Sequence, residues 1–217
     1  LENLGVKIQK LGKGSYSFQA DEINLDYLKS EAFYHEGQAL RGSILIVGPL
    51  LTRFGVGYMP KPGGDKIGRR RLDTHCDGFI KLGAHFEYDE SNFTYSVVAE
   101  RLKGTYMLLE EASVTGTSNV IMAAVLAEGK TTIYNAACEP YVQQLCRMLN
   151  AMGADIQGIG SNLITINGVT QLGGCSHTIL PDMIEIGSWI GLAAMTRSEI
   201  TIKNVGWEHL GIMPTIF

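Results

Sequence analysis

The sequence has little charge, and this excludes several classes of protein. Charged residues make up 18% of the 217 residues, below the ~25% that is usual for globular proteins. Hydrophobic residues make up 45%. This balance excludes intrinsic disorder, a charged coiled coil and a polybasic arm. The net charge of −4 also argues against a general affinity for nucleic acid or for an acidic membrane surface.

Long apolar runs and the common nucleotide-binding motifs are also missing. The longest apolar stretches, Ser43–Leu51 and Val120–Ala127, fall short of the ~18–20 residues that a membrane-spanning helix needs. The sequence has no Gly-x-Gly-x-x-Gly after a predicted strand and no Walker lysine motif. Dinucleotide and P-loop chemistry therefore have no support.

The cysteines lack the Cys-x-x-Cys spacing of zinc and redox sites; they are Cys76, Cys138, Cys146 and Cys175. In a chain of this size they are typical of reduced, packed thiols, and we expect a cytoplasmic protein. The pair Cys175 and His177 is too sparse for a metal site, so no metal is expected. The histidines without a partner visible in the sequence are interpreted as structural or exposed: His35, His85, His177 and His209.

Glycine, in contrast, is abundant, and part of it is periodic. The 26 glycines amount to about 12% of the chain, against a typical ~7%. Leu4–Ile8, Leu82–Phe86 and Met152–Ile156 share an apolar-Gly-apolar pattern that follows a helical segment and leads into an alternating strand. They recur at roughly 70–80 residues, which indicates a repeated α/β unit and is too long for a solenoid.

A second set of segments repeats in step with these turns. The matching strands are predicted at Phe54–Met59, Gly129–Asn135 and Ser198–Asn204, and the apolar helices before them at Ser43–Arg53, Asn119–Leu126 and Gly187–Thr196. The helix at Val120–Leu126 is apolar on every face, so we expect it to be buried all round. The strands alternate, as Leu163–Asn167 does, which predicts one wet face. The sequence therefore predicts an α/β fold of βαβαββ-type units with buried helices and outer sheets.

The most unusual stretch for chemistry is the loop at residues 60–75. Its prolines and the pair Gly63 and Gly64 allow the backbone to approach a ligand and to move. Three consecutive arginines, at 69–71, offer planar groups suited to phosphate or carboxylate. Asp73 is predicted as the N-cap of a helix at Thr74–Leu82, whose amides would face the same ligand. A solvated basic turn is the alternative, but the combination favours a functional site.

A second loop, Glu110–Ser118, leads into the buried helix. Its hydroxyls and glycine at a helix N-terminus form a possible anion site. Ordinary helix capping by Ser or Thr explains the same residues and is the preferred interpretation. Arg41, which precedes the first apolar helix, is either a phosphate ligand or a surface residue; the residues alone leave both open.

Several motifs together resemble the UDP-N-acetylglucosamine enolpyruvyl transferases, also called UDP-N-acetylglucosamine 1-carboxyvinyltransferases. They run along the whole chain: Gly48–Gly55, Pro62–Gly68, Arg70, Asp73, Leu126–Gly129, Asn135–Pro140, Leu180–Glu185 and Gly187. The resemblance implies a first committed step of peptidoglycan synthesis. The enolpyruvyl group of phosphoenolpyruvate would move to the 3′-hydroxyl of UDP-N-acetylglucosamine with release of phosphate and without a cofactor. It also implies an inside-out α/β barrel of the enolpyruvyl transferase type, with three repeats in each of two domains.

The resemblance also implies roles for individual residues. Asp65 takes a loop position that is usually cysteine, and would act as general acid toward the enolpyruvyl methylene; such Asp variants are expected to resist fosfomycin, which alkylates the cysteine. Residues matching the family's substrate-binding positions are Arg41, Arg70, Arg71, Leu72, Asp73, Thr74, Ser113 and Val114. Arg71 replaces a usual proline, and Glu111 stands where many members have a lysine that would meet the diphosphate.

The resemblance implies that residues 1–180 form a catalytic-loop domain without its opening part, and that residues 181–217 begin an incomplete second domain. The expected partners are the two substrates and the missing parts of the same protein; neither nucleic acid nor membrane is expected. Because a phosphoenolpyruvate-binding lysine and a carboxylate base of the family are absent, an alternative is a non-catalytic fragment that binds nucleotide sugar. Nucleic-acid binding through Lys66–Arg71 is a third hypothesis, which depends on one short basic run.

Overall fold

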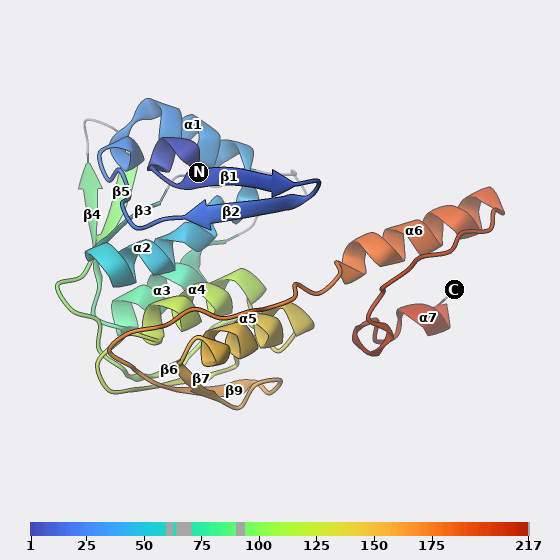
Figure 1. Cartoon of the computed structure of the whole chain (residues 1–217). Helices are drawn as coiled ribbons and strands as arrows, with labels where there is room; N and C mark the ends of the chain where they lie inside the picture. Colours follow the sequence, from blue (N-terminus) through green and yellow to red (C-terminus); the bar gives the residue numbers. More distant parts are fainter. Residues whose placement is uncertain (60–62, 64–70, 90–93, 217) are drawn as a thin grey trace.

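The computed structural model describes residues 1–59, 63, 71–89 and 94–216. Helices lie in the middle of the main body and sheets lie on its outside (Figure 1). The strands are β1 (Lys7–Gly12), β2 (Ser15–Gln19), β3 (Val56–Met59), β4 (His85–Asp89), β5 (Thr94–Val98), β6 (Tyr106–Leu108), β7 (Lys130–Tyr134), β8 (Asp155–Gln157) and β9 (Leu163–Asn167). The α-helices are α1 (Glu31–Ala39), α2 (Val47–Phe54), α3 (Asp73–Lys81), α4 (Val114–Ala124), α5 (Pro140–Ala151), α6 (Met183–Thr196) and α7 (Met213–Ile216).

Residues 106–167 form one complete βαβαββ unit, in the order β6-α4-β7-α5-β8-β9. Its sheet has the order β6-β7-β9-β8, in which β6 and β7 are parallel and the other pairs antiparallel. The preceding residues build the sheet β3-β5-β4 and the separate hairpin β1-β2. The predicted α/β unit is therefore confirmed.

The periodic glycines end a helical segment in the same way each time. Gly5, Gly83 and Gly153 have φ values of 90°, 96° and 103°, which lie in the left-handed region that glycine adopts without a Cβ penalty. In each turn the glycine N–H donates to the carbonyl three residues back, and the next N–H donates to the carbonyl five residues back. This is the Schellman motif, which satisfies the free carbonyls at the end of a helix and sends the chain into the next strand.

Helix α4 occupies the centre of the main body, as its apolar sequence predicts. Val120, Ile121, Ala123 and Ala124 are fully buried, and α2, α3 and α5 all pack against the helix. It begins at Val114, so residues 114–118, which the sequence interpretation placed in a loop, form its first turn. A helix that is apolar on all sides is stable in this place because neighbouring helices cover every face.

The strands of the outer sheets alternate between buried and exposed side chains. In β7, Thr131 and Ile133 face the helices while Lys130 and Tyr134 face solvent. Strand β9 alternates in the same way, with Ile164 and Ile166 buried. The predicted layering of buried helices and half-exposed sheets is thus confirmed.

One predicted strand is wrong. Ser198–Asn204 matches β7 in sequence but forms no regular strand. A strand needs a neighbour to hold its backbone hydrogen bonds, and the part of the chain that the structure describes after α6 contains no strand to pair with it.

The C-terminal segment stands apart from the rest. After β9 the chain runs along α5, where Thr178 accepts a hydrogen bond from Gln144 at 3.0 Å, and α6 and α7 then project away from the main body (Figure 1). Ile186 is the buried residue of α6, whereas Trp189 and Met195 are 47% and 86% exposed. Within the described ranges, none of the helices is both long and apolar enough to cross a bilayer.

Candidate functional site

Most of the predicted site residues lie at the starts of helices. Arg41 opens the 3-10 helix Arg41–Ile46 that continues into α2. Leu72, Asp73 and Thr74 lie at the start of α3, and Ser113 and Val114 at the start of α4. Asp65 and Arg70 lie outside the described residues.

The start of α3 differs from the prediction. Leu72 occupies the N-cap position and Asp73 is the first helical residue. The Asp73 carboxylate accepts a hydrogen bond from Nε of Arg71 at 2.5 Å. A carboxylate in the first turn of a helix remains favourable to the helix dipole.

Arg71 bridges two loops at this end of the molecule. Its guanidinium lies 4.0 Å from Glu110, in the loop before α4. The hydrogen bond that Arg71 donates to Asp73, the field of Asp73 and the fields of Glu110 and Glu111 raise the pKa of Arg71. The exposed guanidinium therefore sits among carboxylates, and an anionic ligand would have to compete with them for it.

The start of α4 is capped by a serine hydroxyl, so the predicted helix capping by Ser or Thr is confirmed. The hydroxyl of Ser113 accepts a hydrogen bond from the Gly116 N–H at 3.1 Å. A Cβ on Gly116 would lie 2.8 Å from Cγ2 of Thr74, so α3 and α4 approach each other closely at their N-terminal ends. Two helix N-termini, each a centre of partial positive charge, thus lie side by side.

Sequence reasoning missed the buried residues that connect these helix starts. His75 is 1% exposed and Asn119 is fully buried; Nδ1 of His75 and Nδ2 of Asn119 are 2.9 Å apart. Burial and the positive charge of Arg41 lower the pKa of His75 to about 4, which places Arg41 near the start of α3. An asparagine just before the apolar run at Val120 was the available signal, because a polar amide in a buried helix must find partners.

The site offers anion-binding groups but no recognisable metal centre. Amides at two helix starts, the guanidinium groups of Arg41 and Arg71, and a hydroxyl at Ser113 suit phosphate or carboxylate groups. Among the described residues, no group of three or more His, Cys, Asp or Glu side chains is placed to hold a metal ion.

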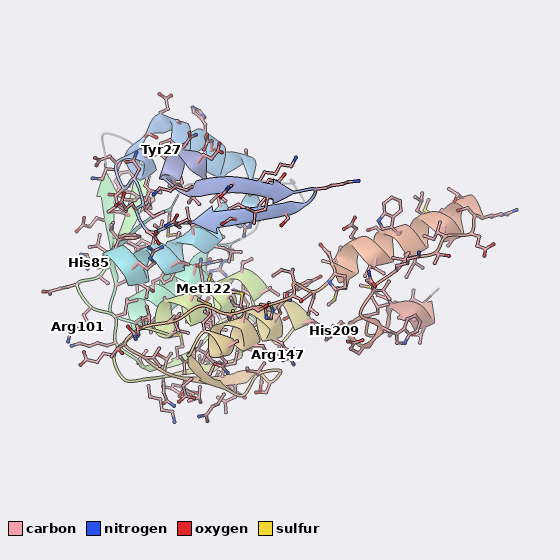
Figure 2. All side chains as sticks on the ribbon, in the orientation of Figure 1. Tyr27, His85, Arg101, Met122, Arg147 and His209 are labelled. Atoms are coloured by element: carbon pink, nitrogen blue, oxygen red, sulfur yellow. The ribbon has the colours of Figure 1, made fainter. Side chains whose placement is uncertain are left out.

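A separate hollow of about 660 Å³ lies at the other ends of the helices, where α2 and α4 finish. Phe54, His85 and Arg101 are among its lining residues, and none of the predicted site residues that the structure describes lines it. His85 and Arg101 lie on the same side of the main body, while Met122 of α4 lies in its middle (Figure 2). This hollow is therefore distinct from the predicted substrate site.

Comparison with known proteins agrees with this arrangement. The EPSP synthase (3-phosphoshikimate 1-carboxyvinyltransferase) family matches residues 1–216. The chain is 62% identical over 217 residues to UDP-N-acetylglucosamine 1-carboxyvinyltransferase of Bacteroides thetaiotaomicron, covering 100% of this chain and 50% of that protein. It is 61% identical over 217 residues to the protein of the same name from Porphyromonas gingivalis, again covering 100% of this chain and 50% of the relative. The chain thus spans about half the length of the curated relatives it matches.

Solved structures support the fold. The crystal structure of the enolpyruvyl transferase NikO from Streptomyces tendae matches 87% of this chain and 44% of its own, with a TM-score of 0.64 and 17% identity. EPSP synthase from Acinetobacter baumannii matches 89% of this chain and 43% of its own, with a TM-score of 0.62 and 20% identity. The α/β enolpyruvyl transferase fold predicted from the sequence is confirmed, and the chain belongs to the EPSP synthase family.

Proposed function

We propose that the protein carrying this chain transfers the enolpyruvyl group of phosphoenolpyruvate to the 3′-hydroxyl of UDP-N-acetylglucosamine, in cytoplasmic peptidoglycan synthesis. The observation that supports this substrate is the 62% identity to UDP-N-acetylglucosamine 1-carboxyvinyltransferase along all 217 residues. The matched EPSP synthase structure, in contrast, is 20% identical. Because each curated relative is about twice as long, activity belongs to the whole protein.

The proposed chemistry assigns the acid to Asp65. A proton delivered by Asp65 to the methylene of phosphoenolpyruvate makes the adjacent carbon electrophilic, and the sugar hydroxyl adds there with loss of its own proton. The bond from that carbon to the phosphate oxygen then breaks, and a proton of the new methyl group returns to Asp65, which restores the double bond in the product. The proposed substrate-binding residues are those implied by the resemblance: Arg41, Arg70, Arg71, Leu72, Asp73, Thr74, Ser113 and Val114.

Substitution of Asp65 tests this assignment. In the full-length protein, phosphate release with both substrates should fall by roughly 10²–10⁴-fold in Asp65→Ala, the usual contribution of a general acid. Asp65→Cys should retain turnover and become sensitive to fosfomycin, whereas the parent should resist it. Unchanged phosphate release in Asp65→Ala would show that Asp65 is not the acid.

A second candidate function is a nucleotide-sugar-binding fragment without catalysis. It applies to the 217 residues alone, which span about half the length of the curated relatives they match. We also propose that residues 1–180 and 181–217 belong to two domains, since α6 projects from the main body. The isolated 217-residue chain should bind UDP-N-acetylglucosamine in calorimetry and release no phosphate. Turnover by this chain would exclude the second candidate.

A further inference from the structure

The hydrogen bonds around Asn119 fix the orientation of its amide. The Gly48 N–H is a donor and lies 3.0 Å from Oδ1 of Asn119, so the oxygen must face α2. The amide nitrogen then donates to the Ile44 carbonyl at 2.8 Å and to Nδ1 of His75 at 2.9 Å. Both N–H groups and the oxygen of this buried side chain therefore bind residues of other elements.

The same bonds fix the tautomer of His75. Because Nδ1 accepts from Asn119, the ring proton of neutral His75 resides on Nε2. Nε2 lies 3.3 Å from the Thr115 hydroxyl and donates to it. The ring is therefore held from both sides by α4, while its backbone belongs to α3.

Asn119 also replaces a missing cap on α2. The N-cap residue of α2, Ile46, provides no side-chain hydrogen bond, and Gly48 is the second helical residue, whose N–H has no partner within the helix. A Cβ at position 48 would lie 2.6 Å from the Asn119 carbonyl, so glycine allows the start of α2 to approach α4 this closely. One asparagine thus caps α2 from a neighbouring helix.

Burial and nearby charge together keep the His75 ring neutral. Helix α4 has no ionisable side chain, and in α2 the charged residue, Arg53, lies in the last turn, away from Gly48. On the ring's own helix, the other ionisable side chains are Asp73, Cys76, Asp77 and Lys81. Burial is the main cause that disfavours the imidazolium, and the field of Arg41 adds to it.

We propose that His75 and Asn119 are positioning residues for enolpyruvyl transfer. They connect the starts of α2, α3 and α4 and thereby hold Arg41, Asp73 and Ser113 in fixed relation to one another. This inference rests on the proposed function, because it concerns the placing of groups that would bind the two substrates. A displacement of about 1 Å at such a site can lower the rate about 10²-fold.

The decisive variant is Asn119→Asp in the full-length protein, assayed by phosphate release. The carboxylate keeps the bond from Gly48, cannot donate to Ile44, and favours a proton on Nδ1 of His75. We expect kcat/KM for phosphoenolpyruvate to fall ~10- to 100-fold at pH 8. As the pH is lowered to 5.5, a further decline should follow the protonation of His75, observed directly as a raised pKa in histidine NMR. The additional change His75→Gln should remove this decline.

Asn150→Asp is the matched control. Asn150 makes an equivalent pair of bonds, donating to the Ile156 carbonyl at 2.8 Å and accepting from its N–H at 2.9 Å, but it connects α5 to β8. Asn150→Asp should lower the unfolding midpoint about as much as Asn119→Asp does, and leave kcat/KM within about twofold of the wild-type value.

Equal kcat/KM values and pH profiles in the two Asp variants would overturn this inference alone. A wild-type protein that releases no phosphate would overturn the proposed function as well. If Asn119→Asp does not fold, His75→Gln replaces it, with the same ~10- to 100-fold fall in kcat/KM expected and wild-type kcat/KM as the contradicting result.

Discussion

At the scale of single residues, the protein keeps several polar groups inside its core, and they differ in how well they are satisfied. Asn119 and Thr117 have partners: the hydroxyl of Thr117 accepts from the Ala137 N–H at 3.0 Å. Thr131 is fully buried and its hydroxyl has no hydrogen-bond partner among the residues that the structure describes. A buried hydroxyl without a partner destabilises the folded state, because it has lost its bonds to water.

Replacing Thr131 by Val should therefore stabilise the chain. Valine has nearly the same shape and removes the unsatisfied hydroxyl, so we expect the free energy of unfolding to rise by about 1 kcal/mol. Urea unfolding followed by circular dichroism measures this. Thr132→Val, on the same strand but half-buried on the other face, is the control and should change little. A loss of stability in Thr131→Val would contradict the assignment of an unpartnered hydroxyl.

His75 should make stability depend on pH. Its pKa is lowered from 6.5 to about 4 in the folded state, so the unfolded chain binds more protons between these values. The stability contributed by the neutral ring is complete above pH 6.5 and is lost as the pH falls through 4. The full loss is about 3 kcal/mol. The difference in unfolding free energy between the parent and His75→Gln, measured from pH 7.5 to 4, should shrink on acidification; a constant difference would contradict it.

At the scale of elements, the three Schellman turns should tolerate no ordinary side chain. A Cβ at Gly153 would meet no atom within 4 Å, yet its φ is 103°. The cost of Gly153→Ala is thus conformational, and we expect a loss of about 1–2 kcal/mol. Gly174 also has open space around its Cβ position, and no left-handed φ, so Gly174→Ala should be neutral. Thermal unfolding of both variants checks this, and equal midpoints would show that the turn imposes no strain.

Features that depend on residues close together in the chain could be predicted from the sequence, and contacts between distant residues could not. The turn at Gly83 and the burial of α4 could be predicted because each depends on residues next to one another in the chain. The predicted N-cap position of Asp73 was wrong by one residue, because α3 begins at Asp73 and Leu72 is its N-cap. His75 and Asn119 are 44 residues apart, and no local pattern indicates that they pair. The roles of Asp65 and Arg70 stay predictions.

At the scale of the whole molecule, the C-terminal segment contributes little to the main body. Helix α6 exposes much of its apolar surface, and its N-cap residue Asp182 accepts a hydrogen bond of 3.4 Å from the Tyr141 hydroxyl of α5. Exposed apolar surface of this kind favours association between molecules.

A shortened chain ending at residue 180 should consequently fold as well as the 217-residue chain and remain more soluble. We expect thermal midpoints within about 2 °C of each other, since few buried contacts are lost. Light scattering should show less self-association in the shortened chain, and Trp189→Glu in the longer chain should have a similar effect. A large fall in the midpoint on shortening would contradict the proposed boundary at residue 180.

The central place of α4 has a consequence for internal motion. Amide hydrogens exchange with solvent through local opening where a segment is weakly packed, and through complete unfolding where it is enclosed. Helix α4 is enclosed by helices from both sides of it in the sequence, so it cannot open unless the two neighbouring repeat units separate. The hairpin β1-β2 is exposed along most of its length and can open alone. Deuterium should therefore enter the hairpin early, and enter α4 last, at the rate at which the entire fold opens.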